Sequence, residues 1–249
     1  MPSEMCCGLY RGTFYLKDLS DEDAALLPVG NAEANITQEM TEITQPNYQS
    51  LGGSACKVTY PESVNLDLIL HCNSPENLAI AFLGQASQLV GAAVEDELHP
   101  VNSIGELIPF LHAPDKSIPV VIESADGLTT YDEGDDYVVT NAGIIIATGS
   151  SIPVAGANIR ASYTYGANWR LDAQTISQKE FLVVLDGVNV GEGEEIPVVL
   201  KAWKVKFSPA ETFALISGED FASLEISGEI LRDDTVLTGS KFFTVEWGV

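Results

Sequence analysis

The chain has 249 residues, 45% of them hydrophobic, which is enough for one large β-rich domain or for a main domain with a small second module. Its 36 acidic residues outnumber the 12 basic ones and give a formal net charge of -24. Because binding to nucleic acids and to anionic membranes depends on Lys and Arg, this balance excludes a DNA-binding protein and predicts that no membrane is a partner.

The N-terminal segment MPSEMCCGLYRG has neither the basic start nor the apolar stretch of a signal peptide. No stretch of the chain reaches the roughly 18 apolar residues of a membrane span. The cysteines show no CxxC spacing and no histidine at zinc-ligand spacing, so we expect reduced thiols and synthesis in a cytoplasm. These cysteines are Cys6, Cys7, Cys56 and Cys72.

Alternating apolar and polar residues, rich in β-branched and aromatic types, predict strands along most of the chain. The first two strands are expected at 13–16 and 27–37. Later ones are expected at 55–60, 64–70, 159–165, 181–185 and 224–231. The pattern therefore predicts an all-β protein.

A polar stretch at 38–54, QEMTEITQPNYQSLGGS, separates two of these strands. Pro46 and the Gly52-Gly53 pair favour a loop, and the stretch is longer than two neighbouring strands need. We expect it to be mobile in the free subunit and to become ordered against another subunit. The residues assigned to this stacking loop are Gln38, Thr41, Pro46, Tyr48, Gly52 and Gly53.

One helix is signalled after the strand at 64–70. Ser74 can cap it, Pro75 suits its first position, and Glu76 favours the positive end of its dipole. Gly84 or Gly91 is expected to end it.

The segment 117–166 reads as a small β module of its own, because turn signals recur in it at short intervals. Strands of the earlier style resume at Phe181. We therefore predict an outer β module at 117–166, inserted into a discontinuous host domain formed by 1–116 and 167–249.

The turn-like segment 131–137, YDEGDDY, concentrates four carboxylates around a glycine. A calcium ion takes six or more oxygen ligands and is one possible occupant, but the spacing does not match an EF-hand. A turn with charges pointing to water is the preferred interpretation, and we expect no metal and no cofactor.

Enzymatic motifs are absent from the sequence. It contains no GxSxG elbow, no phosphate-binding glycine motif and no HExxH. Two carboxylates about 5 to 10 Å apart would suffice for glycoside hydrolysis, yet with 36 acids such pairs arise by chance. We expect a protein that is not an enzyme and has no catalytic residues.

The order of several short segments resembles the major tail proteins, or tail tube proteins, of long-tailed siphophages along nearly the whole chain. These segments are LPVGN at 27–31, NLDLIL at 65–70, ENLAIAFLG at 76–84, ASYTY at 161–165, LDG at 185–187, SPA at 208–210 and LIS at 215–217.

This resemblance implies a β-sandwich with a flanking helix, assembled as hexameric rings whose strands build one continuous inner β-barrel. It implies a structural protein of the bacteriophage virion, located in the tail and assembled in the host cytoplasm. The implied partners are other copies of the chain and the tail terminator, tape-measure and distal tail proteins. Viral DNA would pass through during ejection without specific binding.

The negative charge suits such a tube, because a wall bearing Lys or Arg would hold phosphates and stall the DNA. Alternation assigns side chains to faces: Leu66 and Leu68 define an apolar face and leave Asp67 on the other, where Glu33 is also expected. We predict that Glu33 and Asp67 face the lumen.

Two other functions fit an acidic all-β chain. A β-sandwich adhesin or carbohydrate-binding module would use the inserted segment for recognition and stay monomeric or a small oligomer. A hydrolase would need a deep acidic cleft whose carboxylates differ in pKa.

Overall fold

The computed structural model describes residues 8–46, 54–177, 179–191, 195–215 and 221–248. Among them strands predominate and α1 (Pro75–Ala81) is the one α-helix, so the predicted all-β fold with one helix is confirmed. No helix in the described ranges is long and apolar enough to cross a membrane.

The chain divides into two compact units. Unit 1 comprises 1–86 and 171–249, and unit 2 comprises 87–170. Unit 2 therefore begins at Ser87 rather than at the expected residue 117. The reason is strand pairing: β6 (Ala92–Val101) pairs with β12 (Ala157–Tyr165), and β7 (Leu107–Pro109) pairs with β11 (Gly143–Ile146).

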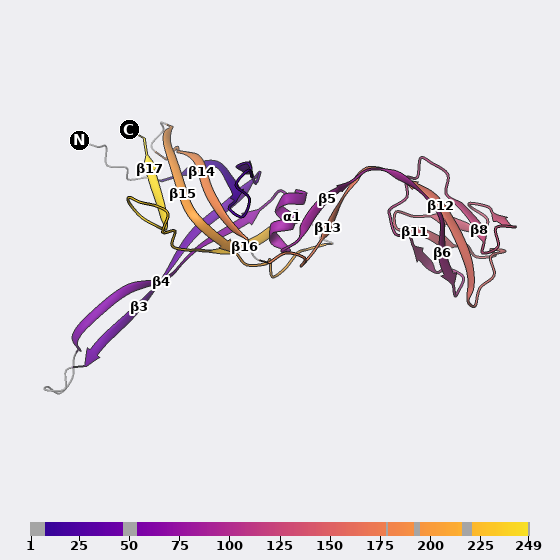
Figure 1. The fold of residues 1–249 in the computed structure, drawn as a ribbon, viewed down its shortest axis with the longest axis horizontal. Coiled ribbons are helices and arrows are strands. Elements are labelled where there is room, and N and C mark those ends of the chain that lie inside the picture. The colour runs from indigo at the N-terminus through magenta and orange to yellow at the C-terminus, as the bar shows by residue number, and fades with distance from the viewer. Residues whose placement is uncertain (1–7, 47–53, 178, 192–194, 216–220, 249) are drawn as a thin grey trace. The chain divides into compact units, whose positions relative to one another are not determined.

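Unit 1 is built on one eight-stranded sheet in the order β2-β1-β14-β15-β16-β4-β3, with β17 paired beside β15 (Figure 1). Every pairing in it is antiparallel. The strands are β1 (Tyr10–Asp18), β2 (Leu27–Pro28), β3 (Ala32–Pro46), β4 (Ser54–Leu70), β14 (Glu180–Asn189), β15 (Ile196–Phe207), β16 (Leu224–Ile230) and β17 (Phe243–Trp247).

Alternation along these strands gives the sheet one buried face. In β16 every second residue is buried, from Leu224 to Ile230, and in β4 the buried positions run from Val64 to Leu70. Buried residues of five strands form a single apolar cluster, so the sheet encloses one core. The intervening side chains necessarily point away from this core.

Helix α1 begins as its sequence predicts. Ser74 accepts a hydrogen bond from the backbone N–H of Asn77, and Pro75 occupies the first turn. The helix ends at Ala81, before Gly84. Asn77 is buried and its amide donates to the carbonyls of Val29 and Cys72 at 2.8 and 2.7 Å. These bonds fix the helix to the segment between β2 and β3 and to the segment that follows β4.

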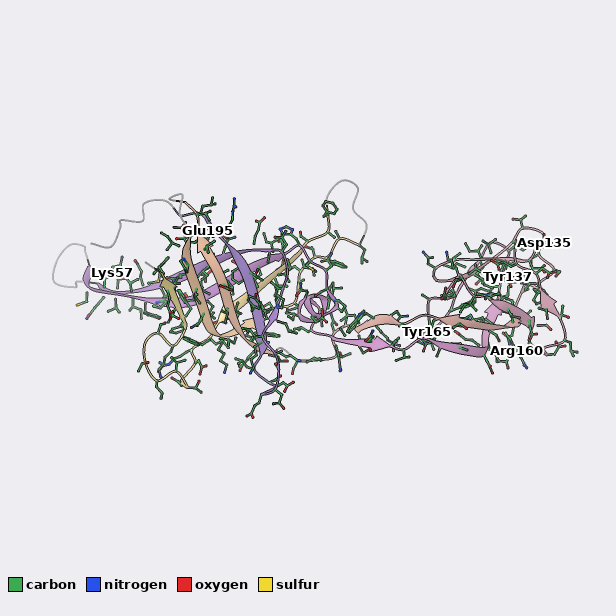
Figure 2. All side chains as sticks on the ribbon, turned by 90° about the horizontal axis from the view of Figure 1, so that it is seen from above. Lys57, Asp135, Tyr137, Arg160, Tyr165 and Glu195 are labelled. Carbon is green, nitrogen blue, oxygen red and sulfur yellow. The ribbon has the colours of Figure 1, made fainter. Side chains whose placement is uncertain are left out.

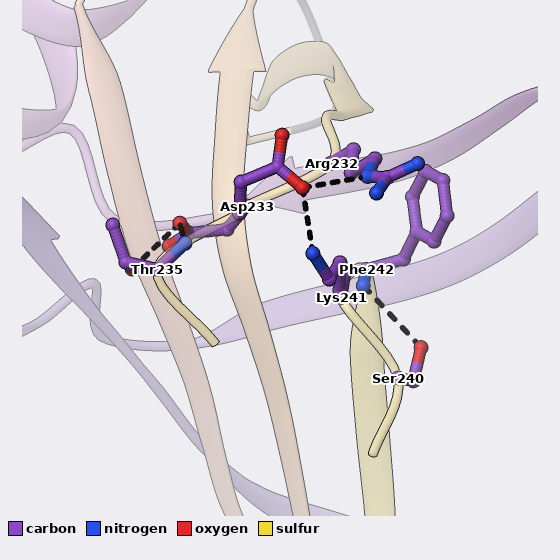
Figure 3. A network of polar contacts seen from close by, with 7 residues as sticks. Arg232, Asp233, Thr235, Ser240, Lys241 and Phe242 are labelled. Carbon is purple, nitrogen blue, oxygen red and sulfur yellow. Dashed lines mark hydrogen bonds and ion pairs between the residues drawn. The ribbon is translucent and has the colours of Figure 1, made fainter. Parts of the chain in front are cut away.

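A polar network organises the segment between β16 and β17 (Figure 3). Asp234 accepts from Arg232 at 2.9 Å and from Lys241 at 2.7 Å, and Asp233 accepts from the Thr235 backbone N–H at 2.9 Å. These contacts hold the chain where it turns between β16 and β17.

Unit 2 has its own core, separate from that of unit 1. A four-stranded sheet in the order β6-β12-β8-β9 and a three-stranded sheet in the order β10-β11-β7 contribute to it. Its remaining strands are β8 (Val121–Ser124), β9 (Thr130–Tyr131) and β10 (Tyr137–Val139). A two-stranded ribbon of β5 (Gln85–Leu89) and β13 (Asn168–Asp172) lies at the junction of the two units in the sequence.

Candidate functional site

Strands β3 and β4 form a long antiparallel hairpin whose outer part extends beyond the other strands of unit 1 (Figure 1). The predicted loop at 38–54 is therefore wrong for 38–46 and for Ser54, which are strand residues. Gln38, Thr41 and Pro46 all lie in β3. Tyr48, Gly52 and Gly53 lie outside the described residues.

The sequence signal for this hairpin was present but was outweighed by its polarity. The β-branched residues of TEIT at 41–44 pair with KVTY at 57–60, a register in which Thr41 faces Tyr60 and Ile43 faces Val58. Pro46 stands at the end of an edge strand, where no inner ladder needs its missing N–H. Since Gln38 to Gln45 pair with β4 in the single chain, their order does not require another subunit.

One face of the outer hairpin carries an exposed apolar strip, formed by Ile43, Val58 and Tyr60. Cross-strand pairing places these side chains on one face. The exposed fraction is 59% for Ile43, 60% for Val58 and 43% for Tyr60. A two-stranded hairpin is only marginally stable by itself in water. Contact between the apolar strip and another protein would therefore stabilise the hairpin.

The opposite face of the outer hairpin is polar. Lys57 forms an ion pair with Glu42 at 2.6 Å, with about half of each side chain exposed. Figure 2 shows Lys57 on the part of the hairpin that extends past the other strands of the unit. The two faces of the hairpin therefore differ in chemistry.

The outward side of β3, β4 and β16 forms an acidic face. Glu33 lies opposite Ile69, which lies opposite Glu225, so these side chains form one row across three strands. Asn35, Asp67 and Ser227 form the next row. The carboxylates of the acidic face are Glu33, Glu39, Asp67, Glu225 and Glu229.

Neighbouring groups hold two of these carboxylates in place. Asp67 accepts a hydrogen bond from the Ser227 hydroxyl, which links β4 to β16. The Glu33 carboxylate lies 3.4 Å from Nε2 of His71. No Lys or Arg occupies an outward position on these strands from 33 to 39, 63 to 69 or 225 to 229, and Lys206 of β15 borders the face opposite Glu229.

The structure brings Glu33 and Asp67 onto the same side of one sheet, as alternation indicated. Sequence reasoning missed Glu225 and Glu229, although the strict alternation of LEISGEI at 224–230 carries the same signal. That alternation placed β16 as a strand but could not show that it pairs with β4.

The acidic turn of unit 2 is organised around Asp136, which is buried. Its carboxylate accepts from the backbone N–H and hydroxyl of Ser151 at 2.6 and 2.9 Å and from the Asp132 N–H at 3.1 Å. Backbone hydrogen bonds from Ser151 and Asp132 lower the pKa of this carboxyl. Asp136 therefore joins two loops, while Asp132, Glu133 and Asp135 are exposed.

Other chemistry has little geometry to support it. Within the described ranges, no three His, Cys, Asp or Glu side chains are grouped so that they could hold a metal ion. An open hollow in unit 1 is lined, among the described residues, by Asn31, His71, Asn73, Phe221 and Ala222, and none of these five is a carboxylate.

The chain belongs to the family described as "Protein of unknown function UCP028589", which matches residues 9–246 and so spans both units. No curated protein matches the chain.

Proposed function

We propose that this member of the UCP028589 family is the structural subunit of a bacteriophage tail tube, in which rings of six copies stack and enclose a passage for DNA. The observation that carries the proposal is the acidic face on β3, β4 and β16, which continues along the same hairpin into the exposed apolar strip. The first surface suits the wall of a DNA passage, and the second suits contact between copies.

The acidic face would line the lumen. Carboxylates on a tube wall repel phosphates and leave DNA free to slide, whereas Lys or Arg would bind it. This face is negatively charged, because its three adjacent strand segments carry five carboxylates and no outward Lys or Arg.

The hairpin would supply contact between copies. A chain with a formal net charge of -24 repels its own copies, so association has to rest on apolar burial and strand pairing. Burying the apolar strip removes Ile43, Val58 and Tyr60 from water, at roughly 25 cal/mol for each Å² of apolar surface. The function needs no catalytic residue, metal or cofactor.

In this proposal the protein resides in the virion tail after assembly in the host cytoplasm, and the tail terminator, tape-measure and distal tail proteins contact the finished tube. The resemblance of the sequence to siphophage tail tube proteins supports this placement.

Sedimentation and negative-stain microscopy of concentrated protein test the proposal. Hollow tubes of uniform diameter are expected. An Ile43→Asp variant should remain in small species because its charge lies within the apolar strip. A matched Thr44→Asp variant, on the opposite face of the same strand, should assemble. Wild-type protein that stays monomeric at every concentration would favour a β-sandwich recognition module instead.

A further inference from the structure

The main sheet of unit 1 has an open edge at each end of its strand order. At one end, β3 pairs with β4 along its length and has no second neighbour among the described strands. At the other end, the short β2 pairs only with Tyr15 and Leu16 of β1. The Val29 N–H donates to the Phe14 carbonyl, which leaves Tyr10 to Thr13 without a strand beside them on that side in the described chain.

The two edges differ in charge. Strand β3 carries Glu33, Glu39 and Glu42 and no basic residue. Strand β1 carries Arg11 and Lys17, and its one acid, Asp18, is paired with Lys179 at 2.6 Å. The exposed acids Asp21, Glu22 and Asp23 lie in the loop between β1 and β2, at the end of β1 remote from Arg11. Arg11 is exposed and lies on the uncovered part of the strand. The uncovered part of β1 around Arg11 is therefore the part of this edge that would attract the acidic hairpin.

Both edges also expose apolar side chains. Along the β1–β2 edge, defined by Leu9, Tyr10, Arg11 and Leu27, the three apolar residues are exposed by about half. The outer hairpin presents the apolar strip described above. Each edge therefore offers unpaired backbone groups, apolar area and a charge of the sign opposite to that of the other edge.

We infer that the β3 edge of one copy, with its hairpin, docks along the β1–β2 edge of a second copy. The inference rests on the proposed self-assembly and names the surface that receives the hairpin. Because two different surfaces of the same chain meet, the contact is heterologous and propagates in one direction, closing into a ring or continuing as a filament.

Charge exchange tests this docking. Arg11→Glu makes the β1–β2 edge acidic, and Glu39→Arg makes the hairpin edge basic. Each variant alone should raise the concentration needed for assembly by roughly tenfold, since an attraction becomes a repulsion. An equimolar mixture should assemble as wild type does, because each variant then supplies the edge that its counterpart needs.

Lys116→Glu and Glu95→Arg, which make the same charge changes at exposed positions of unit 2, are the matched controls and should assemble normally. Thermal unfolding of every variant checks that the fold is intact. If wild type forms tubes and both edge variants form them equally well, or if the mixture stays unassembled, the docking inference is wrong while the tube function stands. Wild type that never associates overturns both.

Discussion

At Asp136, a single buried carboxylate joins the turn before β10 to Ser150 and Ser151 of a second loop in unit 2. A charged acceptor of several short hydrogen bonds stabilises a fold more than a neutral one, and it leaves its donors unsatisfied when removed. This explains why one member of the acidic turn points inward while its neighbours remain exposed.

Asp136→Asn should lower the free energy of unfolding of unit 2 by about 2 kcal/mol, because the amide can no longer accept from all the N–H and O–H donors around it. Chemical denaturation measures the change. Asp135→Asn, at an exposed position in the same turn, is the control and should have little effect. Equal losses in both variants would show that the turn responds to charge alone.

The pH dependence of unit 2 should carry the same signature. The pKa of Asp136 is lowered in the folded state, so its contribution is present above the unfolded value of about 4 and is lost as pH falls through the lower folded value. Wild type should therefore lose more stability on acidification than Asp136→Asn does. Parallel acid titrations of the two proteins would contradict the role given to Asp136.

Two tyrosines of unit 2 should govern its alkaline limit. Burial and nearby carboxylates raise the pKa of Tyr137 to about 12, and burial with the hydrogen bond to Glu97 raises that of Tyr163 to about 12. A tyrosine with a raised pKa contributes fully to the free energy of unfolding below its unfolded-state pKa of about 10. This contribution is lost as pH rises through the pKa of the folded state. Phenolate absorbance should show at least two tyrosines that titrate above the usual range, and one fewer in Tyr137→Phe. Titration of every tyrosine in the usual range would contradict this.

At the scale of elements, the β3–β4 hairpin is the feature that most separates sequence from structure. Alternation identified the inner strands and the two faces of β4, and local cap chemistry identified α1. Neither could show that Thr41 to Gln45 continue the strand, because water is on both sides of the outer hairpin and removes the contrast between buried and exposed positions. Register across the hairpin is a property of pairs, which one strand does not reveal.

Shortening this hairpin should separate folding from assembly. Glu39 faces Ser63 across the hairpin, so replacing 40–62 with an Asn-Gly turn joins two paired positions. The described side chains removed are mostly exposed, and the main sheet should keep its free energy of unfolding within about 1 kcal/mol. Tube formation should be abolished. Normal tubes from this variant would show that the hairpin is not the assembly element.

At the scale of the whole molecule, two separate apolar cores predict two separable units. Deleting 90–167 and joining Leu89 to Asn168 through a short glycine linker keeps the ends of the β5–β13 ribbon. The shortened protein should lose one calorimetric unfolding transition, retain the transition of unit 1 and still form tubes. An insoluble or non-assembling product would place unit 2 within the assembly instead of beside it.

Unit 2 starts earlier than the sequence suggested because the pattern within one strand does not show which strand it pairs with. Strands β6 and β7 precede the turn-rich stretch, and only their pairing with β12 and β11 assigns them to unit 2. The segment 117–166 was identified from its turns, which mark loops between strands without showing which strands share a core. The proposed tube function, in turn, depends on contacts between copies that one chain does not contain.

The central claim is that copies of this chain form a tube with the β3–β4–β16 face on its inside. Cryo-electron microscopy of the assembled protein tests it most directly, because it shows the symmetry and the lumen wall together. The account predicts stacked six-fold rings with Glu33, Asp67 and Glu225 lining the passage. Protein that remains monomeric when concentrated, or tubes whose lumen is lined by another face of the sheet, would contradict it.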